Sequence, residues 1–246
     1  FQTKCLFICF CIMQFESIKT WLPSINEPLI ISGPCGAESL EQLLKTAQQI
    51  KEINKVSLFR AGVWKPRTRP NSFEGKGEEA LQWLTEVKKQ FGFKITVEVA
   101  NAQHTEMALK YGVDVLWIGA RTTANPFSVQ EIADALKGIN VPVMIKNPIH
   151  ADLQLWIGAI ERIYNSGISK IAAIHRGFHY YGKTKYRNKP FWQIPIELRT
   201  LFPDLPIICD SSHISGNKEL IPSVSQKALD LGMNGLMIET HYNPDL

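Results

Sequence analysis

The feature that most constrains the fold is a series of eight short, uninterrupted apolar runs. They recur about every 30 residues, the length of a strand, helix and strand unit. Each run is rich in Ile, Val and Leu, which is typical of parallel strands buried on both faces. The predicted strands cover 29–33, 56–60, 94–99, 114–119, 141–146, 169–175, 205–210 and 234–239.

The segments between these runs carry apolar residues at helical spacing, and several end in a glycine before the next run, as helices commonly do. The predicted helices cover 38–53 (opening at Glu38), 77–92, 102–111, 127–137, 151–165, 192–202 and 217–231. Strands that alternate with helices predict an α/β fold, and eight of them predict a (β/α)8 TIM barrel. A doubly wound open sheet is the alternative, but SGPCGAES lacks the glycine arrangement of a dinucleotide-binding turn.

The chain stops at Leu246, a few residues past the eighth predicted strand, so we expect the eighth helix to be missing from this chain. The predicted organisation is an N-terminal extension over 1–27 and a C-terminally incomplete catalytic barrel over 28–246. The first residues, FQTKCLFICFCIM, make a poor signal peptide because the n-region is weak and no cleavage site follows. Met13 as the natural start is the alternative.

The composition is that of an ordinary globular protein, with 45% hydrophobic and 20% charged residues and a net charge of +4. Acidic and basic residues are interspersed, so the chain shows neither a nucleic-acid face nor a polybasic membrane patch. No apolar run reaches the length of a membrane span. Five cysteines without the pattern of a disulfide framework indicate a reducing compartment, and we expect the cytoplasm.

Four apolar runs end in, or are closely followed by, basic residues. These are Arg60, Lys65 and Arg67, then Arg121, Lys146 and Arg176. In a (β/α)8 barrel the carboxyl ends of all strands face one rim. A buried charge is costly unless it is paired, and Arg and Lys pair well with phosphate and carboxylate. The pattern predicts one anion-binding site, although any single cation could instead pair with a neighbouring carboxylate.

Three other runs end in metal-type ligands, Cys35, His213 and Glu239. Sulfur, nitrogen and oxygen donors together suit Zn, Fe, Mn or Co. Their wide separation gives no spacing motif, so a structural thiol at Cys35 and a loop histidine at His213 are the plainer readings. Glu98 lies inside an apolar run, either as a partner of a site cation or as a helper in proton or water handling. The basic, aromatic segment 178–190 is a solvated loop or a lid.

The segments GPCGAES, FRAGVWKPRT, WIGARTT, IKNP, HRG and CDSSH together resemble the 3-deoxy-7-phosphoheptulonate synthase (DAHP synthase) family, over about residues 28 to 246. KPRT and GARTT distinguish it from the sister 3-deoxy-octulosonate 8-phosphate synthases. The resemblance implies a (β/α)8 barrel that condenses phosphoenolpyruvate with erythrose 4-phosphate. The products are 3-deoxy-D-arabino-heptulosonate 7-phosphate and phosphate, in the first step of the shikimate pathway to the aromatic amino acids.

The resemblance also implies a role for each predicted site residue. The phosphoenolpyruvate site is formed by Arg60, Lys65, Arg121, Lys146 and Arg176, and the contacts to erythrose 4-phosphate are Arg67 and Thr68. A divalent metal ion (Mn, Fe, Co or Zn) is held by Cys35, His213 and Glu239 and polarises the aldehyde as a Lewis acid. Glu98 matches a carboxylate near the attacking water, and the predicted catalytic residues are Lys65, Glu98 and His213.

Two departures from the family pattern bear on the site. The fourth metal ligand of the family is an Asp well beyond Glu239, and Asp245 follows too soon to take that role. Ser211 in CDSSH stands where the family has Pro. The resemblance further implies a homo-oligomer (dimer or tetramer) and a fused or associated chorismate mutase. Two alternatives stay open: a 3-deoxy-octulosonate 8-phosphate synthase-like enzyme, and an inactive barrel from a chorismate mutase fusion.

Overall fold

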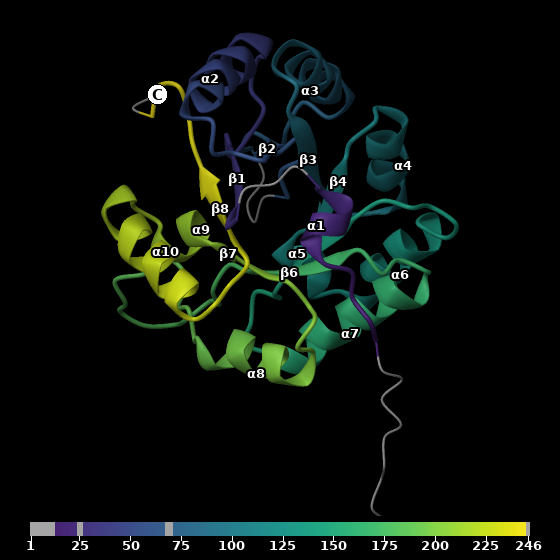
Figure 1. The fold of residues 1–246 in the computed structure, drawn as a ribbon, viewed down its shortest axis with the longest axis vertical. Coiled ribbons are helices and arrows are strands. Elements are labelled where there is room, and N and C mark those ends of the chain that lie inside the picture. Colours follow the sequence, from purple (N-terminus) through teal and green to yellow (C-terminus); the bar gives the residue numbers. More distant parts are fainter. Residues whose placement is uncertain (1–12, 24–26, 67–70, 245–246) are drawn as a thin grey trace, which may run out of the picture.

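A closed barrel of parallel strands forms the centre of the molecule (Figure 1). The computed structural model describes residues 13–23, 27–66 and 71–244. Each strand pairs with the next along the chain, and β8 pairs back with β1. The strands are β1 (Leu29–Gly33), β2 (Leu58–Arg60), β3 (Lys94–Val99), β4 (Val115–Ile118), β5 (Val143–Lys146), β6 (Ile171–His175), β7 (Ile207–Asp210) and β8 (Gly235–Glu239). The predicted (β/α)8 fold is confirmed.

A ring of helices surrounds the barrel and covers the outer face of its strands (Figure 1). They are α2 (Leu40–Ile53), α3 (Glu78–Phe91), α4 (Ala102–Lys110), α6 (Pro126–Ala135), α7 (Leu153–Asn165), α8 (Gln193–Leu201) and α10 (Ile221–Asp230), with a 3-10 turn (Lys218–Leu220) before α10. Helix α2 begins after Ser39 rather than at Glu38, because the Ser39 side chain accepts a hydrogen bond from Gln42 N. No helix follows β8 in the residues described up to Pro244.

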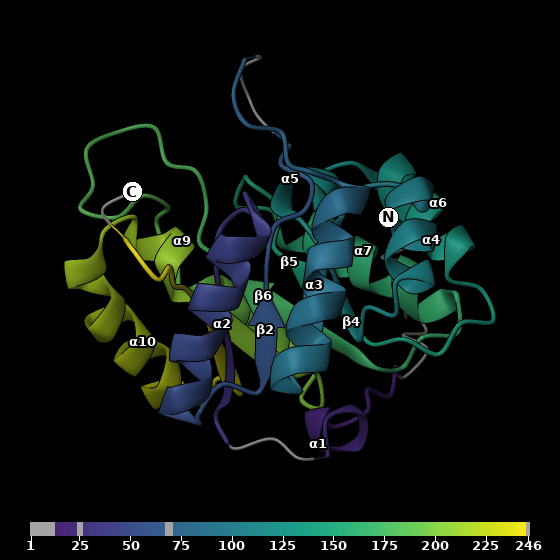
Figure 2. The same ribbon diagram turned by 90° about the horizontal axis from the view of Figure 1, so that it is seen from above.

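Three short helices were not predicted, because four or five residues are too few to show a helical period. They are α1 (Ile18–Trp21), α5 (Ala120–Thr123) and α9 (Ser211–Ser215). Helix α1 lies at the end of the barrel opposite α5 (Figure 2). Its Ile18 and Trp21 pack in one cluster with Leu29 and Ile31 of β1. Helix α1 therefore closes the lower end of the barrel.

Strand alternation decides which side chains enter the barrel. In β2, Leu58 belongs to the cluster inside the barrel, whereas Phe59 packs with the surrounding helices. Met144 of β5 and Ile208 of β7 also lie inside. The residue two positions later in each strand shares its face, so the alternation that buries the core also directs polar side chains into the upper end of the barrel.

The predicted segment 178–190 is a loop between β6 and α8 (Figure 2). Phe178 and Lys189 form an isolated antiparallel bridge at its base. Asn188 in the same loop is buried, and its Nδ2 donates to the His213 carbonyl at 2.6 Å. The loop is thereby attached to α9. Within the described ranges, no helix has both the length and the apolar character needed to cross a membrane.

Candidate active site

Two buried cations lie at the upper end of the barrel interior, above the indole ring of Trp117. Arg60 ends β2 and is 2% exposed, and Lys146 ends β5 and is 4% exposed. The Arg60 Cζ lies 5.2 Å and the Lys146 Nζ 5.6 Å from the centroid of the Trp117 ring. An aromatic face stabilises such cations only modestly. Both positive charges therefore depend on nearby anions.

Each of these cations has a carboxylate partner, but the two pairs differ in quality. Lys146 Nζ lies 2.8 Å from Asp210 Oδ2 and donates a charge-assisted hydrogen bond to it. Arg60 Nη2 is 3.7 Å from Glu239 Oε1, too far for one. Arg60 Nε and Nη1 are buried without hydrogen-bond partners. Unmet donors of a buried charge cost free energy, so Arg60 is arranged to receive an anion.

Arg176 adds a third, partly buried cation directly after β6. Its backbone N–H donates to Asn147 Oδ1 at 2.7 Å, which fixes the turn after the strand. Burial lowers the pKa of Arg176 to about 10; the charge of Asp210 opposes this shift, whereas the charges of Arg187 and Arg121 reinforce it. Arg121, in α5 after β4, therefore lies within electrostatic reach of Arg176. The rim thus gathers positive charge from several strands.

Glu98 of β3 is held by two neighbours on and beside β4. The Trp117 Nε1–H donates to Glu98 Oε2 at 3.0 Å. A Cβ atom added at Gly119 would lie 2.1 Å from Glu98 Oε1. Only a glycine leaves room for the carboxylate at this position. This explains physically why the WIGARTT segment has a glycine at 119. Glu98 is thus placed in the site with one oxygen already bonded.

Cys35 and Lys65 meet above the β1 and β2 ends. Lys65 Nζ donates to the Cys35 carbonyl at 2.8 Å and lies 2.9 Å from Cys35 Sγ. A Cβ atom at Gly62 would lie 2.4 Å from that carbonyl and 2.9 Å from Lys65 Cδ. The close packing over Gly62 therefore places an ammonium beside an exposed thiol.

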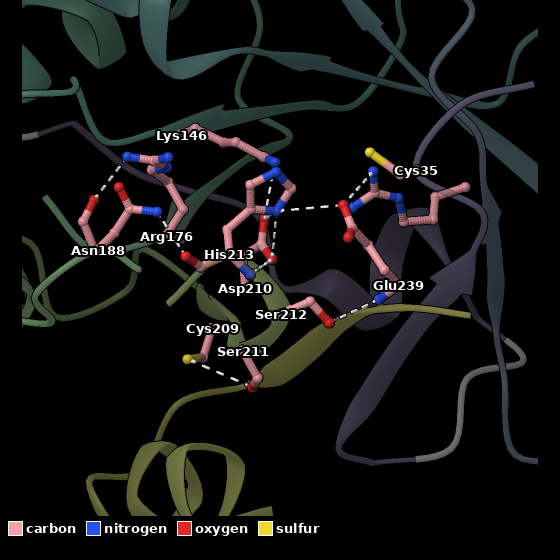
Figure 3. A network of polar contacts seen from close by, with 12 residues as sticks. Cys35, Lys146, Arg176, Asn188, Cys209, Asp210, Ser211, Ser212, His213 and Glu239 are labelled. Atoms are coloured by element: carbon pink, nitrogen blue, oxygen red, sulfur yellow. Dashed lines mark hydrogen bonds and ion pairs between the residues drawn. The ribbon is translucent and has the colours of Figure 1, made fainter. Parts of the chain in front are cut away.

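His213 and Glu239 lie together on the β7 and β8 side of the rim (Figure 3). His213 Nδ1 is 2.9 Å from Asp210 Oδ2 and 3.6 Å from Glu239 Oε1. Burial lowers the pKa of His213, against the opposing charge of Asp210. Burial raises the pKa of the Glu239 carboxyl, but the charges of Arg60 and His213 outweigh this and leave it below its ordinary value. A neutral imidazole thus lies beside two carboxylates.

The three predicted metal ligands converge on one corner of the rim. Cys35 lies beside Glu239 (Figure 3), and Glu239 Oε1 is 3.6 Å from His213 Nδ1. Among the residues that the structure describes, no group of three or more His, Cys, Asp or Glu side chains is arranged to hold a metal ion. Glu239 Oε1 is nevertheless buried without a hydrogen-bond partner. Thiol, imidazole and carboxylate suit a borderline divalent ion, so these residues fit one, and the ligand assignment stays a prediction.

A cavity of about 350 Å³ lies beside Lys65 and Glu98. Its other lining residues are Trp64, Pro66, Glu74, Ala100 and His104. The Trp64 and His104 rings stack at 4.0 Å with an interplanar angle of 7° and form a flat wall. A small polar molecule in this cavity would contact Lys65 and Glu98, two of the three predicted catalytic residues.

The structure thus brings together most of the residues predicted for the site, while Arg67 and Thr68 lie outside the described residues. Sequence reasoning missed Asp210, which is fully buried and contacts both Lys146 and His213. The signal was present, because Asp210 stands two residues after Ile208 and so shares its inward face. Trp117 was missed for a similar reason, since it reads as one more apolar residue of its strand.

His175, the last residue of β6, lies on the outer face of the barrel and not in the site. Its ring packs 5.8 Å from the Phe178 ring and 5.2 Å from the Trp192 ring, centroid to centroid. Burial lowers the pKa of His175 from 6.5 to about 3. The unfolded chain therefore binds a proton between these values that the folded chain does not, and folding stability falls as the pH falls through this range.

We expect His175→Leu to remove this acid sensitivity. Between about pH 7 and pH 5, the wild-type free energy of unfolding should fall by about 2 kcal/mol more than that of the variant, from the linkage of one group. Urea unfolding at both pH values measures the difference. The exposed His150→Leu variant should behave like the wild type. Equal pH dependence in wild type and His175→Leu would contradict a neutral buried imidazole.

Comparison with known proteins agrees with the fold. The sequence profile described as "DAHP synthetase I family" matches residues 24–246. A "Phospho-2-dehydro-3-deoxyheptonate aldolase" of Thermotoga maritima is 32% identical over 216 residues, which is 88% of this chain and 62% of that protein. A "2-dehydro-3-deoxyphosphooctonate aldolase" of Helicobacter hepaticus is 26% identical, over 88% of this chain and 86% of that protein.

Solved structures show the same relationship. The crystal structure of the Thermotoga maritima aldolase (DAHP synthase) superposes with a TM-score of 0.77 at 31% identity, covering 87% of this chain and 60% of that one. A truncated form of the Thermotoga maritima 3-deoxy-D-arabino-heptulosonate 7-phosphate synthase gives 0.75 at 29% identity, covering 88% of this chain and 76% of that one. The chain thus spans about three fifths of the full-length Thermotoga enzyme.

Proposed function

Because the chain belongs to the DAHP synthetase I family, we propose that it is a transferase that condenses phosphoenolpyruvate with erythrose 4-phosphate. The observation that carries this proposal is Arg60, a buried guanidinium whose Nε and Nη1 have no hydrogen-bond partner. Arg60 and Lys146, buried at the ends of β2 and β5, and the partly buried Arg176 after β6 provide charge for a substrate with both a phosphate and a carboxylate. Phosphoenolpyruvate is such a substrate.

The reaction makes one carbon–carbon bond and breaks one carbon–oxygen bond. Carbon three of phosphoenolpyruvate attacks the aldehyde carbon of erythrose 4-phosphate, and the aldehyde oxygen takes up a proton. Water adds to carbon two of the phosphoenolpyruvate part and gives up a proton. The bond from carbon two to the bridging oxygen then breaks, the hydroxyl on carbon two becomes the ketone as its proton passes to the phosphate, and inorganic phosphate leaves. The products are 3-deoxy-D-arabino-heptulosonate 7-phosphate and phosphate.

The cations bind phosphoenolpyruvate and hold it against the acceptor. We assign its phosphate and carboxylate to Arg60, Lys65, Arg121, Lys146 and Arg176. Two phosphorylated substrates repel each other in water, and a rigid set of cations offsets that repulsion and orients them for reaction. Glu98 lies at this site with one oxygen bonded to Trp117. We assign it the proton of the attacking water.

The acceptor sugar binds next to Lys65 and Glu98. The cavity of about 350 Å³ between them supports this placement, since it adjoins both residues. Arg67 and Thr68 follow Lys65 in the chain, and we assign them to the sugar and its phosphate. Lys65, whose ammonium is beside Cys35, is positioned to supply the proton that the aldehyde oxygen takes up. A divalent cation held by Cys35, His213 and Glu239 would polarise that aldehyde.

A 3-deoxy-octulosonate 8-phosphate synthase-like activity is the second candidate. The relative from Helicobacter hepaticus carries the name of the octulosonate enzyme and matches over most of its length. KPRT and GARTT in this chain favour the heptulosonate reaction. The two candidates share phosphoenolpyruvate and differ only in the sugar.

An assay with two acceptor sugars separates these candidates. The protein, purified with its native C-terminus and supplied with Mn²⁺, is incubated with phosphoenolpyruvate and either erythrose 4-phosphate or arabinose 5-phosphate. We expect phosphate release and loss of phosphoenolpyruvate with erythrose 4-phosphate only. Turnover with arabinose 5-phosphate alone would overturn the choice of sugar. No turnover with either sugar would favour the inactive barrel.

The cellular setting follows from the same proposal. The reaction begins aromatic amino acid biosynthesis by the shikimate pathway, and we place the enzyme in the cytoplasm as a homo-oligomer, a dimer or a tetramer. A fused or associated chorismate mutase is a further proposal. Size-exclusion chromatography with light scattering of the native protein gives the assembly, and an assay of chorismate conversion tests the second activity.

A further inference from the structure

We propose that Asp210 is a positioning residue that fixes the His213 ring in the tautomer with the proton on Nδ1. This inference deepens the proposed function, on which it rests for the role of His213. Asp210 is the last residue of β7, on the inward face of the strand, and is completely buried.

Both carboxylate oxygens of Asp210 face His213 (Figure 3). His213 Nδ1 lies 3.0 Å from Oδ1 and 2.9 Å from Oδ2. Glu239 Oε1 lies 3.6 Å from the same nitrogen, too far for a hydrogen bond. A carboxylate can only accept, and a neutral imidazole has one N–H and one lone-pair nitrogen. Nδ1 must therefore carry the proton, and Nε2 keeps the lone pair.

Lys146 keeps Asp210 in the form that accepts. Its Nζ lies 2.8 Å from Oδ2, and both side chains are buried. A buried carboxylate without a counter-charge would gain a proton and could then donate to the ring instead. The lysine of β5 thus acts on His213 through Asp210. One carboxylate connects a residue of the anion site with a residue of the predicted metal corner.

The backbone holds the ring in the same arrangement. Asp210 is the N-cap of α9, and its Oδ1 accepts from the His213 backbone N–H at 3.1 Å. The His213 carbonyl accepts from Asn188 Nδ2 in the 178–190 loop. Both the ring and the backbone of His213 are therefore fixed. A lone-pair nitrogen held in place is what a ligand histidine requires, and carboxylates that hold such rings affect metal affinity strongly.

Asp210→Asn is a suitable test because asparagine is also a good N-cap. Its oxygen can keep the bond from the His213 backbone, whereas its amide group can donate to Nδ1. The ring would then change to the tautomer with the proton on Nε2, and the lone pair needed by a cation would be lost. The matched control is Asp152→Asn, at the exposed N-cap of α7, where the side chain accepts from Leu155 N.

The first measurement is the ¹⁵N NMR spectrum of the histidine rings in metal-free protein at about pH 8, with the His213 signals assigned from a His213→Gln variant. We expect a protonated Nδ1 and an unprotonated Nε2 in the wild type and in Asp152→Asn, and the reverse in Asp210→Asn. A wild-type His213 with its proton on Nε2 would overturn the proposal even if Asp210→Asn does not fold.

The second measurement is Mn²⁺ binding, followed by the EPR signal of the free ion. We expect the affinity to fall about 10- to 100-fold in Asp210→Asn and to stay unchanged in Asp152→Asn. Wild-type Mn²⁺ affinity in folded Asp210→Asn would also overturn the proposal. Neither measurement uses a substrate. If the condensation assay fails but the NMR spectrum shows the His213 proton on Nδ1, the proposed function is rejected. The role of Asp210 as a positioning residue would still stand.

Discussion

Arg60→Met is expected to abolish the stabilisation of the folded protein by phosphoenolpyruvate. A ligand at about 100 times its Kd stabilises a protein by about 2.7 kcal/mol. The Tm of the wild type should therefore rise when phosphoenolpyruvate is added, and the Tm of the variant should hardly change. Arg60 is 2% exposed with two unmet donors, and methionine would remove both the buried charge and these donors. In the assay, the KM for phosphoenolpyruvate should rise more than about 100-fold, equivalent to about 2.7 kcal/mol.

Two further variants show whether the guanidinium itself is needed. Arg60→Lys keeps a positive charge near Glu239 but loses the planar pair of donors, so its response to phosphoenolpyruvate should be intermediate. Arg199→Met removes an arginine that donates to the Leu231 carbonyl, away from the rim, and should keep the wild-type response. Full stabilisation of Arg60→Met by phosphoenolpyruvate would show that the anion binds elsewhere.

Gly119→Ala is expected to reduce kcat about 100-fold with the fold intact, because a misplacement of about 1 Å can cost that much. The added Cβ would lie 2.1 Å from Glu98 Oε1, so the carboxylate must move and give up its bond to Trp117. The backbone of Gly119 has φ −73° and ψ 157°, which alanine adopts without strain. The effect should appear in kcat more than in the KM for phosphoenolpyruvate.

A double-variant cycle identifies the displaced group. Glu98→Ala and Gly119→Ala together should be no slower than Glu98→Ala alone, since the added methyl then has nothing to displace. Gly158→Ala in α7 is the matched control, because a Cβ atom there meets nothing within 4 Å. It should keep full activity and gain about 0.5–1 kcal/mol of stability. Equal and independent losses from the two changes would mean that Gly119 acts on another part of the site.

The strands and the longer helices were predictable because their signals are local. An apolar run of Ile, Val and Leu indicates a buried strand whichever residues later pack on it, and an amphipathic segment indicates a helix. The predicted strand over 56–60 is Leu58–Arg60 in the structure, and the other predicted strands are found with similar small differences. Helices α1, α5 and α9 could not be predicted, since their few residues are stabilised by contacts with the barrel.

The site could be predicted only as a set of strand ends. Arg60, Lys146 and Glu239 each end a strand, and the topology of a parallel barrel brings such ends to one rim. The family resemblance added roles for these residues. Asp210 was missed because the apolar run before it was assigned a single functional residue, His213. Strand alternation from Ile208 nevertheless places the Asp210 side chain inside the barrel.

The sequence alone was sufficient to determine the barrel and the residues at its rim. Eight apolar runs in order predict the strands, and the residues at their ends predict the rim, because strand burial and strand direction depend on short stretches of chain. Only the tertiary structure decided which partners these residues have. Lys146 pairs with Asp210, and Arg60 is left with unmet donors. Such pairings depend on distances of a few ångströms between residues far apart in the chain, set by the closure of the barrel and the packing within it.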